Sequence, residues 1–382
     1  YNLGILFYIV LSIGLFGKFL LSKTKVQSKL YELNSIVYLG FGLGVFIYIL
    51  ILLSFTGLLN RNYVLIIITV FFFLGLKDIN IEKTLKNLKY YFFYNDIGYY
   101  IYIKILILVF AIFYLGLSLS PSLEGDSLAG YLILPREYSI AQGLLPVDYA
   151  YGSFLPQNGH LISTVGFLIN DQILAQLLVS WLMGLICIAT IYSIGVFIFN
   201  RQVALIGSLM WYGTASVAYL SLSAKIDLAW AAFELLALYI FAQWYNKNSY
   251  ENNSDLLILS GFFLGIAGGI KQVSIFTIIV LSLAIVYRIL SKNHFSFLNI
   301  LKPYLMFLIP VSLSIIWITR TFIYKGVLIY KIGSYPNYEG LIGFFKVIWD
   351  MSMLGNMIGS EGPMGKSIGP SILALLPFIF FF

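Results

Sequence analysis

Charged residues, cysteine and histidine are all scarce in this chain. Only 10% of its 382 residues are Asp, Glu, Lys or Arg, and it holds one cysteine and two histidines. With Cys187 alone, no intramolecular disulfide can form and no cysteine cluster can bind a metal. His160 and His294 fall in different loops, which excludes a histidine-rich metal site. The chain also has no G-x-G-x-x-G motif, no P-loop and no nucleophile elbow, so the usual sequence signals of nucleotide binding and serine hydrolysis are missing.

Apolar residues are abundant instead. They make up 60% of the sequence, and the mean hydropathy of +0.92 lies well above that of soluble domains. Apolar runs of about 17–25 residues recur along the chain, which predicts an all-α, polytopic transmembrane helical bundle whose main partner is the lipid bilayer. The net charge of +7 comes mostly from lysines in short loops. Such lysines specify topology, so they do not indicate a nucleic acid partner.

The apolar runs predict about eleven spans, and the last is expected to be cut off at Phe382 because it begins only near residue 372. The C-terminus of the sequence is therefore expected to be incomplete. The predicted spans cover residues 2–20, 36–59, 62–76, 101–119, 173–199, 203–222, 228–245, 256–270, 272–290 and 303–319.

The short loops predict the orientation of the bundle. Lysines gather between residues 23 and 29 and again between residues 77 and 89, two loops that open on the same side. By the positive-inside rule that side is cytoplasmic. The loops at 120–172, 223–227, 271 and 320–371 are then expected to face away from the cytoplasm.

An acidic pair opens the first long loop. Glu124 and Asp126 follow an apolar span directly. Two carboxylates this close could share a proton or a cation, which suits a general base or a metal ligand. The alternative is a solvated loop in which Asp126 caps a helix. The same loop predicts two interfacial helices, an amphipathic one at 129–145 that Pro146 ends, and a second at 157–169 with His160 near its start.

Further charges fall at expected span ends on the same face. Asp227 lies in a short turn, where a charge within the hydrocarbon would cost up to roughly 2.5–3.5 kcal/mol. It is either a functional acid or a helix cap, and Lys225 beside it is a candidate partner. Lys271 follows a run of small residues and suits an anion such as phosphate, with a snorkelling turn lysine as the alternative. Arg320 also faces the outer side, against the positive-inside expectation.

In their order and sidedness these motifs resemble the GT-C superfamily of polytopic glycosyltransferases, which includes protein O-mannosyltransferases and the aminoarabinose transferases of lipid A. The resemblance covers roughly residues 101–340. The segments that carry it are Glu-Gly-Asp-Ser-Leu-Ala-Gly-Tyr-Leu-Ile-Leu-Pro-Arg-Glu-Tyr at 124–138, Gly-Ser-Phe-Leu-Pro-Gln-Asn-Gly-His-Leu at 152–161, Lys-Ile-Asp-Leu-Ala at 225–229, Gly-Ile-Ala-Gly-Gly-Ile-Lys at 265–271, and Trp-Ile-Thr-Arg at 317–320 through to Tyr-Pro at 335–336.

The resemblance implies a glycosyltransferase of a bacterial or archaeal cell membrane. Its donor would be a polyprenyl-phosphate-linked sugar, its acceptor a lipid, glycan or protein, and its active site extracytoplasmic. Residues 101–382 would form the GT-C-like catalytic core, preceded by a three-span extension at 1–100.

The resemblance also implies roles for the charged residues. Asp126 would be the general base or linked to a metal, and Lys271 and Arg320 would stabilise the departing phosphate. A divalent metal ion stays open as a cofactor, with Asp126 and Asp227 as its ligands if one is present. The remaining candidate site residues are Glu124 among the catalytic acids and Arg136, His160 and Lys225 among the substrate-binding residues.

Three other functions remain open from the residues alone. A transporter or flippase of lipid-linked saccharides should show internal repeats and interrupted spans near the midplane, and no convincing repeat is visible. A polymerase or ligase of such saccharides would rely on loop arginine and histidine rather than on an early acidic motif. A purely structural membrane protein is the third.

Overall fold

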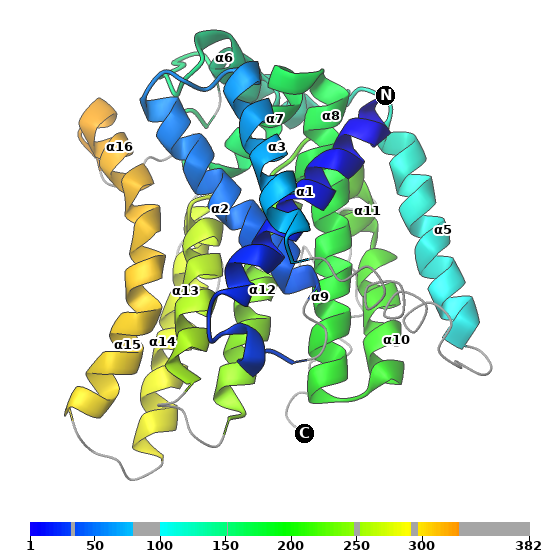
Figure 1. Cartoon of the computed structure of the whole chain (residues 1–382). Coiled ribbons are helices and arrows are strands. Elements are labelled where there is room, and N and C mark those ends of the chain that lie inside the picture. Colours follow the sequence, from blue (N-terminus) through cyan, green and yellow to red (C-terminus); the bar gives the residue numbers. More distant parts are fainter. Residues whose placement is uncertain (32–34, 79–99, 151, 248–252, 292–296, 328–382) are drawn as a thin grey trace, which may run out of the picture.

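The protein folds as a bundle of helices (Figure 1). Shorter segments form a cap at one end, which comprises the described residues between 119 and 171. The structure is a computed structural model that describes residues 1–31, 35–78, 100–150, 152–247, 253–291 and 297–327, and those residues contain helices and no strand. The predicted all-α fold is confirmed. The long helices are α1 (Asn2–Ser22), α2 (Ser35–Phe55), α3 (Arg61–Leu76), α5 (Tyr100–Ser118), α9 (Leu182–Ile198), α10 (Arg201–Tyr212), α12 (Asp227–Tyr245), α13 (Ser254–Gly268), α14 (Ile275–Leu290), α15 (Phe297–Val311) and α16 (Ile315–Lys325).

Shorter segments connect them. They are the π-helical turn η2 (Ser127–Tyr131), α6 (Ile133–Ala141), α7 (Asn158–Ile169), α8 (Gln172–Gln176), the π-helical turn η3 (Leu177–Trp181), α11 (Ala215–Leu222), and the 3₁₀ turns η1 (Gln27–Lys29), η5 (Gln272–Ser274) and η6 (Ser312–Ser314).

Seven helices of the described chain are long and apolar enough to cross a membrane, and an eighth is added if the bent pair α10 and α11 is one span. The pair turns by 64° at its break, next to Gly213. The apolar helices α3 and α13 are shorter than this limit, with 16 and 15 residues. The expected count of eleven therefore stays a prediction, and its last span, near residue 372, lies outside the described residues.

The two helices expected in the loop at 120–172 both form. The first has different bounds from those expected, and the second has different surroundings. The first is divided into η2 and α6, and it ends before Pro146 because Gln142 adopts the left-handed conformation, with φ of 55°. The second, α7, begins within one residue of its expected start. It does not lie in the interface: every residue from Asn158 to Gly166 is buried. Its Ser and Thr hydroxyls donate to carbonyls one turn back within the helix, so they can be buried without an unpaired donor.

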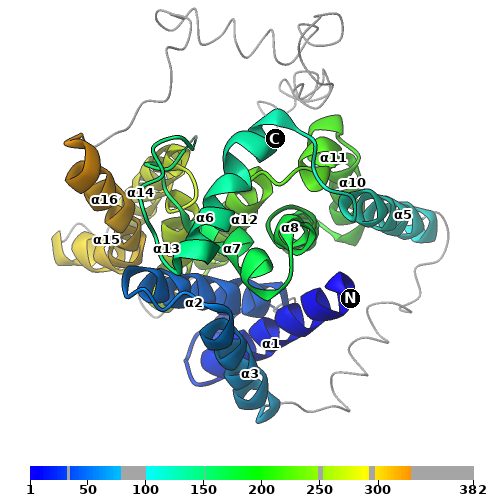
Figure 2. The same ribbon diagram turned by 90° about the horizontal axis from the view of Figure 1, so that it is seen from above.

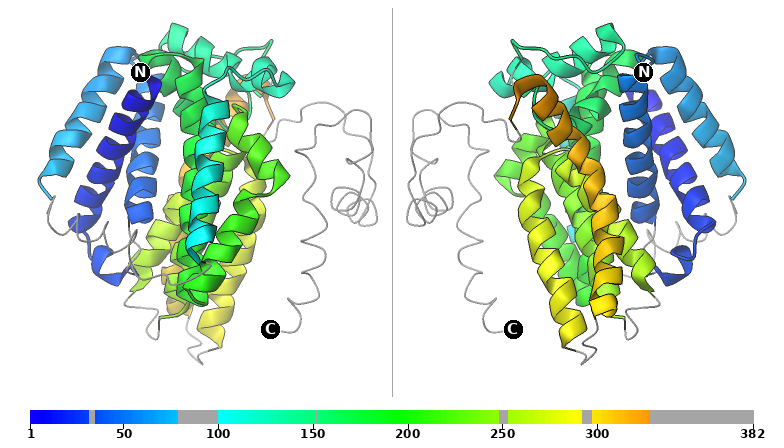
Figure 3. Two further views of the ribbon diagram at one scale, coloured as in Figure 1. Left: turned by 90° about the vertical axis from the view of Figure 1, so that its right-hand side faces the viewer. Right: turned by 90° about the vertical axis from the view of Figure 1, so that its left-hand side faces the viewer.

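The N-terminal helices α1, α2 and α3 form a layer on one side of the bundle (Figures 2 and 3). Glycines allow their close approach, since a Cβ on Gly42 would meet the carbonyl oxygen of Ile13 at 2.1 Å. The opposite face of α2 packs on the rest of the bundle, where a Cβ on Gly40 would meet the side chain of Leu236 at 2.4 Å. The boundary near residue 100 between extension and core remains a prediction.

The described parts of the loops expected on the outer side meet at one end of the bundle, and residues 328–371 lie outside the described residues. The cap, the turn between α11 and α12, the turn before η5 and the end of α16 lie at the end that also holds the start of α1 (Figure 1). Hydrogen bonds join these parts: Ala224 donates to Ser127 at 3.2 Å, and Asn158 to Ile266 at 3.1 Å. Which side of a membrane this end faces stays a prediction from the lysine pattern.

That orientation can be tested by cysteine labelling in intact cells. Tyr149 in the cap is 72% exposed, so Tyr149→Cys should react with a membrane-impermeant maleimide without lysis. Ser153 lies four residues further on but is only 1% exposed. Ser153→Cys is the matched control and should react only after denaturation, as should the buried native Cys187. Reaction of Tyr149→Cys only after lysis would reverse the orientation.

Candidate functional site

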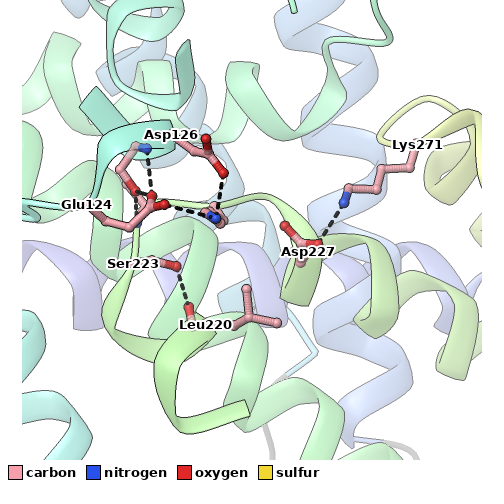
Figure 4. A network of polar contacts seen from close by, with 9 residues as sticks. Glu124, Asp126, Leu220, Ser223, Asp227 and Lys271 are labelled. Carbon is pink, nitrogen blue, oxygen red and sulfur yellow. Dashed lines mark hydrogen bonds and ion pairs between the residues drawn. The ribbon is translucent and has the colours of Figure 1, made fainter. Parts of the chain in front are cut away.

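The acid pair at 124 and 126 is held by a lysine from a distant turn. Nζ of Lys225 lies 3.1 Å from Oε1 of Glu124 and 2.8 Å from Oδ2 of Asp126. Figure 4 shows both carboxylates turned toward the loop that leads into α12. The pairing of Lys225 with Asp227, considered from the sequence, is not the one formed.

The two carboxylates differ in their hydrogen-bond partners and in their exposure. Oε2 of Glu124 accepts from the backbone N–H of Ser127 at 2.7 Å and from its hydroxyl at 2.9 Å, and the Glu124 side chain is 21% exposed. Glu124 therefore anchors the start of η2. Asp126 makes the lysine contact with one oxygen, and its side chain is 63% exposed. Of the two acids, Asp126 is the more accessible from solution.

The electrostatics of the cluster favour the ionised form of Glu124 and the protonated form of Lys225. Burial by itself would raise the pKa of Glu124, but the hydrogen bonds from Lys225 and Ser127, together with the lysine charge, lower it to about 2. Burial would lower the pKa of Lys225, but its bonds to Asp126 and Glu124 outweigh this and raise it well above its usual range. At neutral pH Glu124 is thus ionised and Lys225 is charged.

The turn that bears Lys225 is fixed by side chains from both π-helical segments. The hydroxyl of Ser127, in η2, accepts from the N–H of Ala224. The hydroxyl of Ser180, in η3, donates to the carbonyls of Ser223 and Lys225. The side-chain amide of Gln176 donates to the carbonyl of Leu222 at 2.9 Å. Short π-helical segments are rare and occur often at functional sites, and here both contact the same turn.

A second ion pair lies beside the first (Figure 4). Nζ of Lys271 is 2.6 Å from Oδ1 of Asp227, and the two side chains are 26% and 28% exposed. Lys271 also lies 5.8 Å from the centre of the Trp230 ring, whose N–H donates to Ser274. Asp227 is the first residue of α12, where the helix dipole favours a negative charge. Lys271 is partly exposed and has one acidic partner, which leaves donors for an anion.

Helix α7 packs against the turns that carry both acid and lysine pairs. A Cβ on Gly159 would meet Ile226 at 2.7 Å and Ile270 at 3.4 Å, so the start of α7 sits against both turns. Asn158 holds it there: its amide donates to the carbonyl of Ile266, and its oxygen accepts from Trp317 at 2.9 Å. The small-residue run before Lys271 does allow close packing, because a Cβ on Gly269 would meet the Asn158 side chain at 2.0 Å.

Arg320 lies at the same end of the bundle but is only 3% exposed. Its guanidinium donates to the carbonyls of Ser153, at 2.6 Å, and Leu145, at 3.3 Å. Two of its nitrogens thus hold the loop between α6 and α7. Its positive charge also lowers the pKa of the buried His160.

His160 and Arg136 differ in burial. His160 is 3% exposed, and its ring stacks on Tyr131 with 5.7 Å between centres. Burial, with a smaller effect of the Arg320 charge, lowers its pKa to about 3, so it is neutral at physiological pH. Arg136 is exposed on α6. Within the part of the chain that the structure describes, neither side chain forms a hydrogen bond or ion pair with Glu124 or Asp126.

The donor set does not fit a divalent metal ion in this arrangement. Among the described residues, no three His, Cys, Asp or Glu side chains group as metal ligands would. Asp126 and Asp227 each already contact a lysine ammonium, at 2.8 and 2.6 Å. A second cation there would face a like charge.

Sequence reasoning missed the residues that position the site. Gln176, Ser180 and Trp230 lie in apolar helices for which the sequence pattern predicts only membrane spans. A polar side chain inside an apolar span is itself a signal, since it must find a partner or mark a functional site. Their partners are carbonyls and hydroxyls far along the chain, which no local pattern identifies.

Comparison with known families gives a match over part of the chain. Residues 156–317 match the family model of the dolichyl-phosphate-mannose-protein mannosyltransferases, which are of the GT-C type. The resemblance to GT-C glycosyltransferases is thereby confirmed over that segment. It includes Lys225, Asp227 and Lys271, whereas Glu124 and Asp126 precede it. No match is found among curated proteins or among solved structures.

The pairing of Glu124 predicts a pH-dependent contribution to stability. Because folding lowers the pKa of Glu124 from 4.5 to about 2, its stabilisation is present above pH 4.5 and is lost as the pH falls toward 2. Glu124→Gln should lower the free energy of unfolding by roughly 1–2 kcal/mol at pH 7, after allowing for solvent screening. Thermal unfolding in detergent at pH 7 and pH 3 measures this.

At pH 3 the difference from the wild type should shrink. Asp148→Asn is the control, because Asp148 also pairs with a lysine but is 78% exposed, and it should change stability little at either pH. An effect of Glu124→Gln that is equal at both pH values would contradict the electrostatic explanation.

Proposed function

We propose that the protein transfers a sugar from a polyprenyl-phosphate donor to a hydroxyl of a lipid, glycan or protein acceptor, on the extracytoplasmic face of a cell membrane. The family match implies a glycosyltransferase of the GT-C type in a membrane. The donor, the acceptor and the side of the membrane are our proposal. The observation that carries it is the exposed carboxylate of Asp126, held at one end of an apolar bundle beside a partly exposed lysine, Lys271.

Asp126 is proposed as the general base. A hydroxyl is a poor nucleophile at neutral pH, and a positioned carboxylate can take its proton as it attacks the sugar. Asp126 is ion-paired through one oxygen and 63% exposed, so its second oxygen can accept that proton. Glu124 is proposed to hold the loop and the lysine, because both of its oxygens already accept hydrogen bonds.

Lys271 is proposed to bind the phosphate of the donor. Its ammonium can contact a phosphate oxygen while Asp227 holds it at the start of α12. As the sugar leaves, negative charge grows on the phosphate, and a fixed cation stabilises that charge. Asp227 is thus proposed to orient Lys271 rather than to take a proton.

The remaining candidates are proposed to act at a greater distance. Arg320 fixes the loop through the carbonyls of Leu145 and Ser153 and adds positive potential without contacting the substrate. His160, neutral and buried, supports Tyr131. Arg136 is exposed on α6 and is proposed to meet the anionic part of the donor from the aqueous side.

Replacing the base should abolish most transfer. Asp126→Asn keeps the size of the side chain but removes its charge, so the rate of sugar transfer should fall about 10²–10⁴-fold while the protein level and donor binding stay close to wild type. Purified membranes with a lipid-linked sugar donor provide the assay. Asp148→Asn, another lysine-paired acid at this end of the bundle, is the control and should transfer at the wild-type rate. Wild-type transfer by Asp126→Asn would exclude Asp126 as the base.

Removing the proposed phosphate ligand should act on donor binding. Lys271→Met keeps the apolar stem and should weaken binding of the polyprenyl phosphate by about 1.5–3 kcal/mol, or about 10–150-fold in Kd. Lys325→Met is the control, since Lys325 pairs with Asp148 outside the proposed site. A Lys271→Met variant that binds the lipid phosphate as tightly as the wild type would remove Lys271 from the donor site.

A further inference from the structure

The ammonium of Lys225 occupies an unusual position. It lies between two carboxylates of one loop, 3.1 Å from Glu124 and 2.8 Å from Asp126. A point between two converging carboxylates is the place that a hard divalent cation takes in oxygen-ligand sites. Here a side chain of the protein fills it.

The fold holds this ammonium in place. The Lys225 side chain is 10% exposed, and its nitrogen lies 5.4 Å from the centre of the Tyr219 ring, where a cation is attracted to the aromatic face. The backbone on either side is fixed, since Ala224 donates to Ser127 and the carbonyl of Lys225 accepts from Ser180. A surface lysine that merely found an acid would need no such support.

We propose that Lys225 is a positioning residue that takes the place of a divalent cation at the acid pair, so that the reaction at Asp126 needs no metal ion. The role in the reaction rests on the proposed function, but the occupation of the cation position does not. Lys225 does not contact the substrate. It orients Asp126 through one oxygen and reduces the charge of the acid pair from two negative charges to one.

An ammonium suits a base better than a divalent ion would. A metal ion bound to Asp126 would hold its lone pairs strongly and would lower its ability to accept a proton. A single ammonium shared between the two carboxylates contacts only one oxygen of Asp126. The second oxygen of Asp126 then remains available toward the exposed side.

The first test measures metal binding and needs no enzyme assay. Purified wild-type protein in detergent should not bind Mn²⁺ at the acid pair, as followed by electron paramagnetic resonance of free Mn²⁺. Lys225→Ala should open the position and bind Mn²⁺ saturably, and Asp126→Asn in the same protein should remove that binding. Lys325→Ala is the matched control, because it frees only the single carboxylate of Asp148 and should create no site.

The second test measures transfer. Wild-type transfer should be unchanged by EDTA. Lys225→Met should lower kcat about 10-fold or more with an unchanged KM for the donor, in protein that thermal unfolding shows to be folded at the assay temperature. Lys225→Ala should be similarly slow and should regain at least several-fold activity with methylammonium or ethylammonium ions, whereas the filled Lys225→Met should not.

Several results would overturn the inference. In the metal-binding test, these are Mn²⁺ binding by the wild type that Asp126→Asn abolishes, or no Mn²⁺ binding by a folded Lys225→Ala. In the transfer test, they are loss of wild-type transfer in EDTA, a wild-type kcat for Lys225→Met, or no recovery of a folded Lys225→Ala with either amine. If wild-type protein transfers no sugar while the Mn²⁺ results are as expected, the proposed function fails and the occupation of the cation position stands.

Discussion

A polar group inside an apolar bundle must find its partner within the protein, and the turn between α11 and α12 depends on that constraint. Three carbonyls and one N–H of this turn are bonded to side chains of Gln176, Ser180 and Ser127; they belong to Leu222, Ser223 and Lys225, and to Ala224. Left unpaired in an apolar environment, each such group would cost several kcal/mol. The position of the turn backbone therefore depends on the positions of these three side chains.

The position of the acid pair follows from that turn. A fixed backbone places the Lys225 ammonium, the ammonium places Glu124 and Asp126, and Glu124 in turn anchors the N-terminal end of η2 through Ser127. Because Ser127 also accepts from Ala224, the chain of contacts closes on itself. The loop that follows α5 is thereby held against a turn about a hundred residues further along the chain.

Helix α7 plays the same part for the second ion pair. Its glycine at 159 admits the turns on both sides, and Asn158 bonds to α13 and to Trp317. The turns that carry the two acid and lysine pairs thus pack against one buried helix at one end of the bundle. In our proposal one pair holds the base and the other holds the cation that meets the departing phosphate.

The amino-acid sequence alone predicts the helical membrane class, the approximate bounds of most helices, the acidic motif after α5 and the resemblance that the family match confirms over residues 156–317. Long apolar runs, and charges that interrupt them, are local features that survive any arrangement of the helices. The tertiary structure decided which acid meets which lysine, that α7 is buried, that Arg320 holds a loop, and that Glu124 and Asp126 differ in exposure. These depend on contacts such as that of Lys225 with Asp126, between residues 99 positions apart. Such contacts are fixed only when the whole bundle packs and every buried polar group has found its partner.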